Sequence, residues 1–484
     1  MRRLVAVGAA TLGLLVVPTS AQAFNPNDPL APKQWYLTQD RAFDAFNDVP
    51  DLPVVRVAVI DSGVDPSHPE LQGRIVAMRN FVGGGSPVDE QGHGTFVAGE
   101  IAAAVDNARG MAGLAPAARL LVAKVVRDDG TVSPRTEARA IRWAVDRGAR
   151  VINVSLGGVR DPADRHHSGF SVVEQRAVDY ASSHGALVVA SVGNNPYPGG
   201  DPWRFAGYPA ALSHVLGVGS YGKDGDVSQF SNRDDVYVDL VAPGEDVFSL
   251  FPRALTAKNP GCTEQGYSSC GPKEYRHAAG TSFSVPQVSA AAAMLFALRP
   301  WLQPEQVSTL VERTAAGTTA ANGCGDCLPG RDALSGWGRL DIAAAVRALR
   351  NGRVPPADLG EPNDDVLLGT ALRRRVTRLQ ATIDYWDDRN DVYRVKLNRG
   401  QRISVVARAG PAADVSLVLW KPALRSLATR RSELRARRSV HRPGVTEHLV
   451  YRARKSGWYS LQVVSARPGA GRYSLTVRRS RPGA

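Results

Sequence analysis

Three polar residues in this sequence lie at the borders of apolar runs. Asp61 follows the β-branched run at residues 54–60, His93 lies in Gly-His-Gly-Thr-Phe-Val-Ala-Gly, and Ser282 lies in Gly-Thr-Ser-Phe-Ser-Val-Pro. A serine hydroxyl becomes an effective nucleophile when a neighbouring histidine takes its proton. A carboxylate orients that histidine and stabilises its charged form. Together, these residue types indicate acyl transfer.

A fourth polar residue, Asn194, follows another apolar run in Ser-Val-Gly-Asn. Its side-chain amide would be a donor for the oxyanion of a tetrahedral intermediate, and losing one such donor costs about a hundredfold to a thousandfold in turnover. Each residue alone also has a structural explanation, because a Ser or Asp beside a helix is often a cap. The joint occurrence of Asp, His, Asn and Ser in this order favours catalysis.

The elements that must position these residues alternate along the chain. Short apolar runs typical of buried strands occur at residues 54–60, 120–126, 151–154, 186–191, 215–218 and 236–241. Helical patterns occur at residues 137–147, 172–184 and 341–349, after His93 and after Ser284. This predicts an α/β fold, with a mostly parallel sheet and helices on both faces. Functional loops gather at the carboxyl ends of such strands.

Charge and pattern divide the chain into two parts. The net charge is +13, but residues 351–484 alone hold 27 basic and 11 acidic residues. Residues 350–362, rich in Gly and Pro, are predicted to be a linker between a domain at 24–349 and one at 363–484. Short alternating runs at 391–397, 402–407, 415–420, 457–464 and 471–477 predict a small all-β sandwich or jelly roll. One interpretation of this positive charge is that the domain binds an acidic surface. The alternative is that the arginines only keep the domain soluble.

The first 23 residues have the pattern of a secretory signal peptide. Two arginines precede an apolar stretch at 4–17, and Ala21-Gln22-Ala23 is a small-residue cleavage site. A membrane anchor is the alternative, but the stretch is shorter than the roughly 20 residues that span a bilayer. The apolar run at 290–298 is predicted to be a buried helix. We therefore expect a secreted protein with no membrane span and no nucleic-acid partner.

The four cysteines fit an oxidising compartment. Cys262 and Cys270 form one local pair, and Cys324 and Cys327 form another. Four cysteines permit three pairings, which sequence does not distinguish. We favour the two local disulfides, because each would close a Gly-rich loop. A metal site is disfavoured by the unequal spacings and by export, and a redox pair at Cys-Gly-Asp-Cys has no thioredoxin-like surroundings.

The segments around Asp61, His93 and Ser282 resemble the three signature segments of the subtilisin-like serine proteases. The segment at 151–158 resembles the substrate-binding strand of that family, Ser-Val-Gly-Asn194 its oxyanion segment, and residues 336–341 its closing segment. The resemblance covers residues 28–348. It implies the subtilisin-like form of the α/β fold.

What the resemblance implies about function is a monomeric, secreted serine endopeptidase that acts on polypeptides. Ser282 would form the acyl-enzyme, His93 would act as base and then acid, and Asp61 would orient His93. Asn194 and the backbone N–H of Ser282 would bind the oxyanion. The segment made of Ser155, Leu156 and Gly157 would pair with an extended substrate by strand addition.

The chain departs from the family pattern at two places. Phe283 and Ser284 follow the serine, where many relatives have Met-Ala. Asn27-Asp-Pro-Leu, which resembles the start of a mature catalytic domain, comes almost directly after the predicted signal. We therefore expect folding without an N-terminal prodomain. The C-terminal segment resembles the bacterial pre-peptidase C-terminal domain at 361–365, 391–397, 399–401 and 456–461.

Calcium is the structural ion of the subtilisin-like family, and no cofactor is expected for the chemistry itself. Glu70 and Asn107 occupy positions that resemble one of the family's calcium sites, with Asp28 and Gln34 as additional ligands. The alternative is an exposed acid and a turn amide.

Three rival functions remain to be compared. A catalytically silent peptide- or surface-binding relative is disfavoured by the presence of Asp61, His93, Ser282 and Asn194. An esterase of the α/β-hydrolase class is disfavoured because neither its Gly-x-Ser-x-Gly elbow nor its Ser-Asp-His order is present. In the third, the basic β domain carries the main function as an adhesive module.

Overall fold

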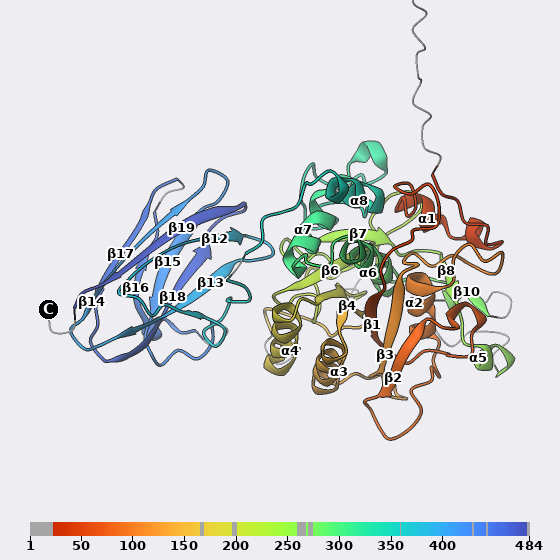
Figure 1. Ribbon diagram of the computed structural model, residues 1–484, viewed down its shortest axis with the longest axis horizontal. Coiled ribbons are helices and arrows are strands. Elements are labelled where there is room, and N and C mark those ends of the chain that lie inside the picture. Colours follow the sequence, from red (N-terminus) through yellow and green to blue (C-terminus); the bar gives the residue numbers. More distant parts are fainter. Residues whose placement is uncertain are drawn as a thin grey trace, which may run out of the picture.

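A parallel sheet forms the centre of the first part of the chain (Figure 1). The computed structural model describes residues 23–164, 169–195, 201–258, 268–269, 274–358, 360–427, 430–441 and 444–481. The strands are β1 (Val55–Asp61), β2 (Ile75–Asn80), β3 (Ala118–Lys124), β4 (Ala149–Val154), β5 (Leu187–Ser191), β6 (Val215–Tyr221) and β7 (Leu240–Pro243). Their order is β2-β3-β1-β4-β5-β6-β7, and every neighbouring pair is parallel.

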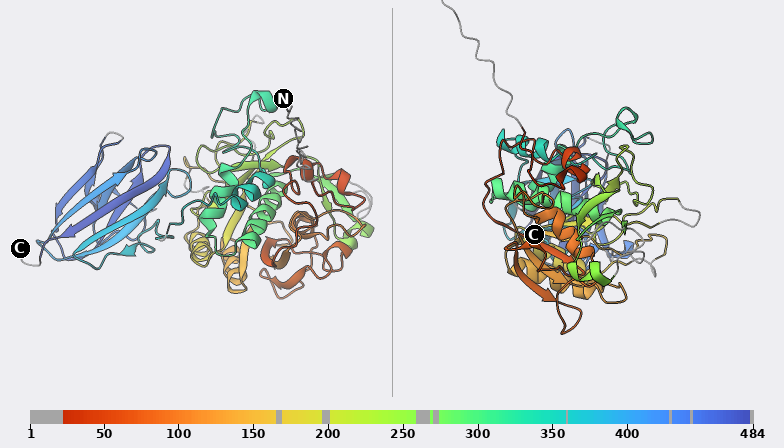
Figure 2. Two further views of the ribbon diagram at one scale, coloured as in Figure 1. Left: turned by 45° about the horizontal axis from the view of Figure 1, so that its top comes forward. Right: turned by 90° about the vertical axis from the view of Figure 1, so that its right-hand side faces the viewer.

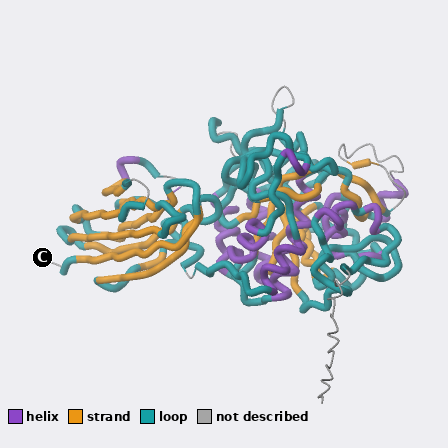
Figure 3. The backbone as a smooth tube through the Cα atoms, turned by 90° about the horizontal axis from the view of Figure 1, so that it is seen from above, coloured by secondary structure: helices purple, strands orange, loops and turns teal. Residues whose placement is uncertain are grey.

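Helices cover both faces of this sheet, as predicted (Figure 3). One face packs against α2 (His93–Ala102), α6 (Thr281–Leu298), α7 (Pro304–Arg313) and α8 (Ile342–Arg350). The other face packs against α3 (Pro134–Asp146) and α4 (Val172–Ser183). Outside these layers lie α1 (Trp35–Gln39), α5 (Arg253–Lys258), β8 (Val247–Leu250), β9 (Ser268–Ser269), β10 (Tyr275–Ala278) and the 3-10 turns Ala31–Lys33, Pro69–Leu71 and Ala320–Asn322.

Helix α6 forms the apolar centre of its layer. By length and composition it is long and apolar enough to cross a membrane, but 89% of it is buried inside the molecule. Burial on all sides is typical of a core helix whose residues are apolar all round. The apolar run at 290–298 is thus part of a buried helix, as predicted.

The strand predicted at 236–241 is wrong at its start, because β7 begins only at Leu240. The side-chain Oδ1 of Asp234 accepts hydrogen bonds from the backbone N–H groups of Val236 (2.9 Å) and Tyr237 (3.1 Å). An Asp that binds the backbone two residues later forms a turn. This turn keeps the β-branched residues before Leu240 out of the sheet.

The C-terminal part is a β sandwich, drawn in blue at the left of Figure 2. One sheet has the order β11-β13-β18-β15-β16 and the other β12-β19-β14-β17. The strands are β11 (Thr370–Ala371), β12 (Val376–Asp384), β13 (Asn390–Leu397), β14 (Arg402–Ala409), β15 (Val415–Trp420), β16 (Arg435–Ser439), β17 (Glu447–Arg452), β18 (Gly457–Ser465) and β19 (Ala470–Arg479), with a 3-10 turn at Ser432–Leu434. Alternating side chains such as Ile403, Val405 and Ala407 are fully buried in the shared core.

The sandwich packs against the α/β part through polar and aromatic contacts. Arg313 in α7 pairs with Asp384 in β12 at 2.8 Å, and Trp337 contacts Trp386 with ring centroids 5.0 Å apart. The predicted end of the first domain at residue 349 and the predicted start of the second at residue 363 stay predictions. The first sandwich strand, β11, begins after both of them.

One of the two favoured disulfides is confirmed. Cys324 and Cys327 are bonded, and both are buried in a small cluster with Val227. Cys262 and Cys270 lie outside the described residues, as do residues 1–22 of the predicted signal.

Candidate active site

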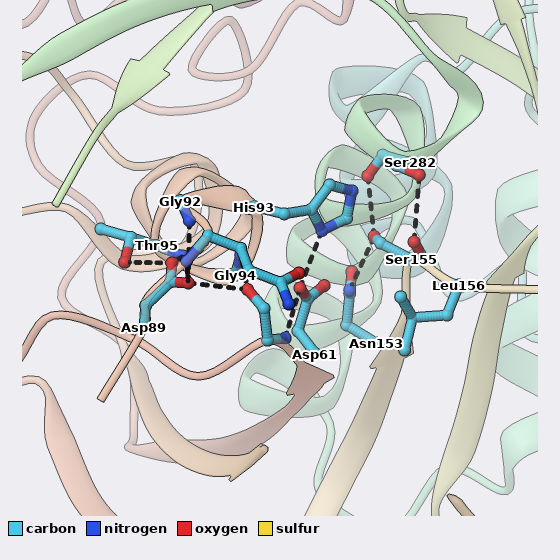
Figure 4. Close-up of polar contacts among 12 residues, drawn as sticks. Asp61, Asp89, Gly92, His93, Gly94, Thr95, Asn153, Ser155, Leu156 and Ser282 are labelled. Carbon is cyan, nitrogen blue, oxygen red and sulfur yellow. Dashed lines mark hydrogen bonds and ion pairs between the residues drawn. The ribbon is translucent and has the colours of Figure 1, made fainter. Parts of the chain in front are cut away.

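Asp61 and His93 meet where β1 ends and α2 begins (Figure 4). Asp61 is fully buried, and its Oδ1 lies 2.7 Å from Nδ1 of His93, whose side chain is 13% exposed. The backbone N–H of Ser62 donates to the same oxygen at 2.7 Å. A buried carboxylate held in this way fixes the orientation of the imidazole.

Gly94 permits this close approach of helix and strand. A Cβ at Gly94 would lie 2.1 Å from the backbone oxygen of Gly63 and 3.1 Å from Cβ of Asp61. No side chain fits in that space. The glycine after His93 is therefore needed to place the histidine against Asp61.

The pKa of His93 is set by opposing effects. Burial lowers it, whereas the charge and hydrogen bond of Asp61 and the charge of Asp89 raise it, and the net pKa lies above its ordinary value. The surrounding carboxylates thus stabilise the imidazolium form. That form arises whenever His93 accepts a proton from a neighbouring group.

Asp89 holds the loop before α2 and was missed by the sequence reasoning. Its Oδ1 accepts hydrogen bonds from the N–H groups of Gln91 (3.0 Å) and Gly92 (2.8 Å) and from the hydroxyl of Ser62 (2.8 Å). Its Oδ2 accepts from the N–H (2.9 Å) and hydroxyl (2.7 Å) of Thr95. These bonds tie the start of α2 to the loop after β1 (Figure 4). An Asp three residues before Gly92 was the available sequence signal.

Ser282 lies in the first turn of α6 and is tied to the end of β4. Its hydroxyl donates to the backbone oxygen of Ser155 (3.0 Å), and the Ser155 hydroxyl donates back to the oxygen of Ser282 (2.7 Å). The amide of Asn153 in turn donates to the Ser155 hydroxyl (3.0 Å). In Figure 4 the second ring nitrogen of His93 points toward Ser282. The structure therefore brings Asp61, His93 and Ser282 together.

Asn194 is oriented by the residue before the serine. Its side-chain oxygen accepts from both the N–H (3.0 Å) and the hydroxyl (2.8 Å) of Thr281. These two donors identify the oxygen, so the amide NH₂ faces the other way and can donate a hydrogen bond on that side. Gly280 has φ +150°, and a Cβ there would lie 3.2 Å from this nitrogen. Glycine thus leaves room for the amide.

Phe283 fills the space behind the histidine. It is 1% exposed, and its ring centroid lies 5.3 Å from His93 and 4.5 Å from Phe96. The hydroxyl of Ser284 donates to the backbone oxygen of Ala242 at 2.9 Å. The same hydroxyl also lies 3.3 Å from the backbone oxygen of Pro243, so the Phe-Ser pair is accommodated by packing and by these hydrogen bonds.

The segment after β4 carries the predicted substrate-binding residues. Leu156 is half-buried, and its backbone oxygen accepts from the Ser191 hydroxyl at 3.3 Å. Gly157 is exposed, and the next residue, Gly158, bonds to Tyr208 at 2.7 Å and 2.9 Å. The structure thus brings Ser155 beside Ser282 and leaves Gly157 accessible from solvent.

The predicted calcium ligands lie together in part. Glu70 is near Asp28, contacts the side chain of Asn107, and has one buried oxygen, Oε2, with no hydrogen-bond partner among the described residues. Burial raises the pKa of Glu70 to about 7. Gln34 instead binds both backbone groups of Ala112. The unpartnered carboxylate oxygen beside other oxygen donors fits a hard cation.

The assembled groups supply the parts of an acyl-transfer site. The carboxylate of Asp61 comes from the end of β1, the amide of Asn194 from the loop after β5, the imidazole of His93 from the start of α2 and the hydroxyl of Ser282 from the start of α6. Carboxyl ends of adjacent parallel strands are the usual place for such a site.

Comparison with known proteins agrees with this interpretation. Residues 54–338 match the Peptidase S8, or subtilase, family. Thermitase of Thermoactinomyces vulgaris is 33% identical over 275 residues, which are 56% of this chain and 85% of that protein. An intracellular serine protease of Paenibacillus polymyxa is 34% identical over 295 residues, 59% and 77% of the two chains. A solved protease of Pseudoalteromonas arctica superimposes with a TM-score of 0.53 at 26% identity, covering 67% of this chain and 99% of that one.

Proposed function

Because this chain belongs to the subtilase family and is a serine endopeptidase that acts on polypeptides, we propose that Ser282, His93 and Asp61 are its catalytic triad. The observation that carries the proposal is the 2.7 Å contact of His93 Nδ1 with buried Asp61, while the second ring nitrogen points toward Ser282. In this geometry the ring nitrogen that faces Ser282 can exchange protons with the serine.

The proposed reaction forms and hydrolyses an acyl-enzyme. The Ser282 hydroxyl turns from the backbone oxygen of Ser155 toward His93, gives up its proton and attacks the scissile carbonyl. His93 then passes that proton to the leaving amine. In the second half, His93 takes a proton from water, which attacks the ester carbonyl, and then gives that proton to the Ser282 oxygen as the acid product leaves. Asp61 stays ionised throughout and stabilises the imidazolium.

The polypeptide substrate would bind as an added strand along the segment of Ser155, Leu156 and Gly157. The exposed backbone at Gly157 supports this mode, because strand addition needs free N–H and C=O groups. The oxyanion would form between the backbone N–H of Ser282 and the side-chain NH₂ of Asn194. Thr281 holds the oxygen of that amide, so its NH₂ faces away from Thr281.

A fluorophosphonate probe tests the triad against a catalytically silent scaffold. We expect the folded native chain to be labelled once, at Ser282, and the Ser282→Ala variant to stay unlabelled, because only an activated serine attacks phosphorus. Mass spectrometry of the labelled peptide gives the site. An unlabelled native chain, beside a reactive control protease, would refute the proposed nucleophile.

Replacing Asn194 tests the oxyanion site. The nearly isosteric Asn194→Asp variant loses the N–H donor and is expected to lower kcat about 10²- to 10³-fold. KM should change little, since the donor acts mainly in the transition state. Steady-state kinetics on one peptide amide measure both constants. Asn195→Asp, one residue further on, is the matched control, and an equal loss in both variants would argue against an oxyanion role for Asn194.

Asp89 is expected to act as a positioning residue. Asp89→Asn puts a donor where Asp89 now accepts five hydrogen bonds, so the start of α2 should shift. A misplacement of about 1 Å costs up to about a hundredfold in rate. We expect kcat to fall while KM stays unchanged. The acid limb of the pH profile of kcat/KM should move to lower pH, because the variant lacks a charge that raises the pKa of His93.

The control for Asp89 is Asp129→Asn. Asp129 also accepts the N–H and hydroxyl of a Thr two residues on, Thr131, but it lies in an exposed turn. It should leave kcat and the pH profile unchanged. Loss of thermal stability in Asp89→Asn without any change in kcat would reduce Asp89 to a structural role.

Secretion, calcium binding and surface attachment complete the proposal. The pattern of residues 1–23 supports export with a mature chain starting at Phe24, which N-terminal sequencing of protein from the culture medium would test.

Calcium would be held by Glu70 and Asn107 with Asp28, where it would balance the charge of the buried Glu70 carboxylate. The basic sandwich, which resembles the pre-peptidase C-terminal domain, would hold acidic surfaces.

A further inference from the structure

One sheet of the sandwich carries a face of basic side chains. Alternate residues of β12, β14, β17 and β19 point away from the shared core, because successive side chains of a strand lie on opposite faces of its sheet. The basic residues at these outward positions are all exposed. They are Arg378, Arg402, Arg408, Arg452, Arg472, Arg478 and His448, and we call these seven residues the basic face.

The strand register distributes these charges over the whole sheet. Arg402 in β14 lies directly opposite Arg452 in β17. Like charges in directly opposite positions destabilise a sheet, so the stability of the fold does not explain this pair. The other basic residues lie opposite hydroxyl or apolar side chains: Arg478 opposite Ser404, Arg408 opposite Ser474, Arg378 opposite Thr476, Arg472 opposite Thr382 and His448 opposite Val406. Cationic and hydroxyl groups therefore lie side by side across the face.

Protein carboxylates do not neutralise these arginines. Within the described residues, none of the six arginines forms an ion pair, and Arg452 is the one whose side chain makes a hydrogen bond, from Nε to the backbone oxygen of Gly400 at 2.8 Å. The carboxylates near this sheet lie at the end of β12, where Asp358 binds Thr382 and Asp384 pairs with α7. The exposed guanidinium groups are therefore available to an external anion.

A hollow of about 290 Å³ lies within this face. Every side chain that lines it belongs to β14, β17 or β19, namely Ser404, Val406, Arg408, His448, Ser474, Thr476 and Arg478. Three hydroxyl groups thus lie between two guanidinium groups and an imidazole. This set can donate hydrogen bonds to carboxylates and can both donate to and accept from neutral hydroxyl groups.

The composition of the face selects among polyanions. No Phe, Tyr or Trp lines the hollow, whereas proteins that hold single-stranded nucleic acids stack the bases on aromatic rings. Among the described residues, Val376 is the one exposed large hydrophobic side chain in these four strands, and binding in a membrane surface needs a larger apolar face. A chain of acidic sugars offers both hydroxyl and carboxylate groups, which match the groups of the basic face.

We propose that the basic face binds a linear acidic polysaccharide whose sugars carry carboxylate groups. Such a polymer is the acidic surface that the sandwich would hold, so this inference rests on the proposed function. Arginine binds a carboxylate through two parallel hydrogen bonds, which gives each contact its geometry. A single exposed contact of this kind is weak, but a polymer engages several at once, and their effects combine.

Isothermal titration calorimetry of the full chain with polygalacturonate measures this binding. The parent protein carries Ser282→Ala, which prevents self-cleavage. We expect the parent to bind polygalacturonate and not the same polymer with its carboxylates methyl-esterified, because the ester removes the charge that the arginines recognise. The affinity should fall as the salt concentration increases, since exposed charges are screened.

Two triple variants separate the basic face from the overall charge of the sandwich. The test variant combines Arg402→Gln, Arg408→Gln and Arg478→Gln, and it should bind polygalacturonate at least about tenfold more weakly than the parent. The control variant loses the same charge from exposed arginines outside the face, by Arg425→Gln, Arg431→Gln and Arg438→Gln. It should keep the affinity of the parent within about threefold. Equal losses in the two variants would overturn the proposal, because only the net charge would then matter.

Thermal unfolding and peptide cleavage check that the test variant is otherwise intact. It should unfold at the temperature of the parent or higher, because Arg402 no longer opposes Arg452. With Ser282 restored, the same three substitutions should leave kcat on a short peptide unchanged, since none of them lies in the proposed active site. A test variant that is folded and binds polygalacturonate as the parent does would overturn the proposal.

Other polyanions identify the partner. Polyglutamate, single-stranded DNA and vesicles of phosphatidylglycerol with phosphatidylcholine are titrated under the same conditions, and each should bind the parent more weakly than polygalacturonate does. If one of them bound as tightly or more tightly, with the same loss in the test variant, the sandwich would still hold an acidic surface but the assignment to a polysaccharide would be wrong. If the parent bound none of the four probes, the proposed attachment to acidic surfaces would fail together with this inference, and the triad would be unaffected.

Discussion

The Ser282→Ala variant is expected to cleave a peptide amide about 10⁶-fold more slowly in kcat than the native chain. The reason lies in the site. Without the hydroxyl no acyl-enzyme can form, so His93 has no serine proton to accept, although His93 and Asp61 keep their 2.7 Å contact. Only the oxyanion donors and substrate binding remain, which together give a residual acceleration of about 10³- to 10⁴-fold over water.

The measurement compares kcat of the two proteins on one chromogenic peptide, with the variant purified separately to avoid traces of active enzyme. Ser284→Ala is the matched control, since it removes a hydroxyl two residues away that bonds to the backbone oxygens of Ala242 and Pro243. It should keep kcat within about tenfold of the native value. If Ser282→Ala lost no more than Ser284→Ala, the nucleophile would have to be another residue.

The sequence was most informative in the segments around Asp61, His93 and Ser282. The glycine after His93 has a structural reason, because a Cβ at Gly94 would lie 2.1 Å from the backbone oxygen of Gly63. The alternation of apolar runs and helical patterns predicted the parallel sheet, because strands buried on both faces have few polar residues. The same rule explains why β2 was missed: it is an edge strand, half-exposed along its length, with Arg and Asn near its end.

Contacts between distant segments were beyond sequence reasoning. Strand β16, Arg435–Ser439, carries three arginines and joins a sheet only because β15 pairs with it. Asp89 has the appearance of a turn residue until Ser62 and Thr95 are seen to bind it. Asp358 and Asp391 are likewise far apart in the chain, and only the packing of the sandwich makes them neighbours.

Asp61→Asn is expected to lower kcat by about 10⁴ while leaving the fold intact. The amide is nearly isosteric with the carboxylate, and the Ser62 N–H that now binds Asp61 can still reach the amide oxygen. The amide NH₂ would then face His93 as a donor. It would favour the tautomer with a proton on Nε2, which cannot accept the proton of Ser282.

The pH profile of this variant gives a second, independent readout. In the native chain burial lowers the pKa of His93, but the charge and hydrogen bond of Asp61 and the charge of Asp89 raise it above its ordinary value. His93 must be neutral to act as a base, so kcat/KM rises as pH increases through that pKa. Removing the charge of Asp61 lowers the pKa, and the acid limb of Asp61→Asn should therefore move to lower pH. Asp65→Asn, which removes a nearby buried carboxylate that binds Ser67 and Arg253, should leave the limb in place. An acid limb that stays fixed in Asp61→Asn would mean that His93 is not the group being titrated.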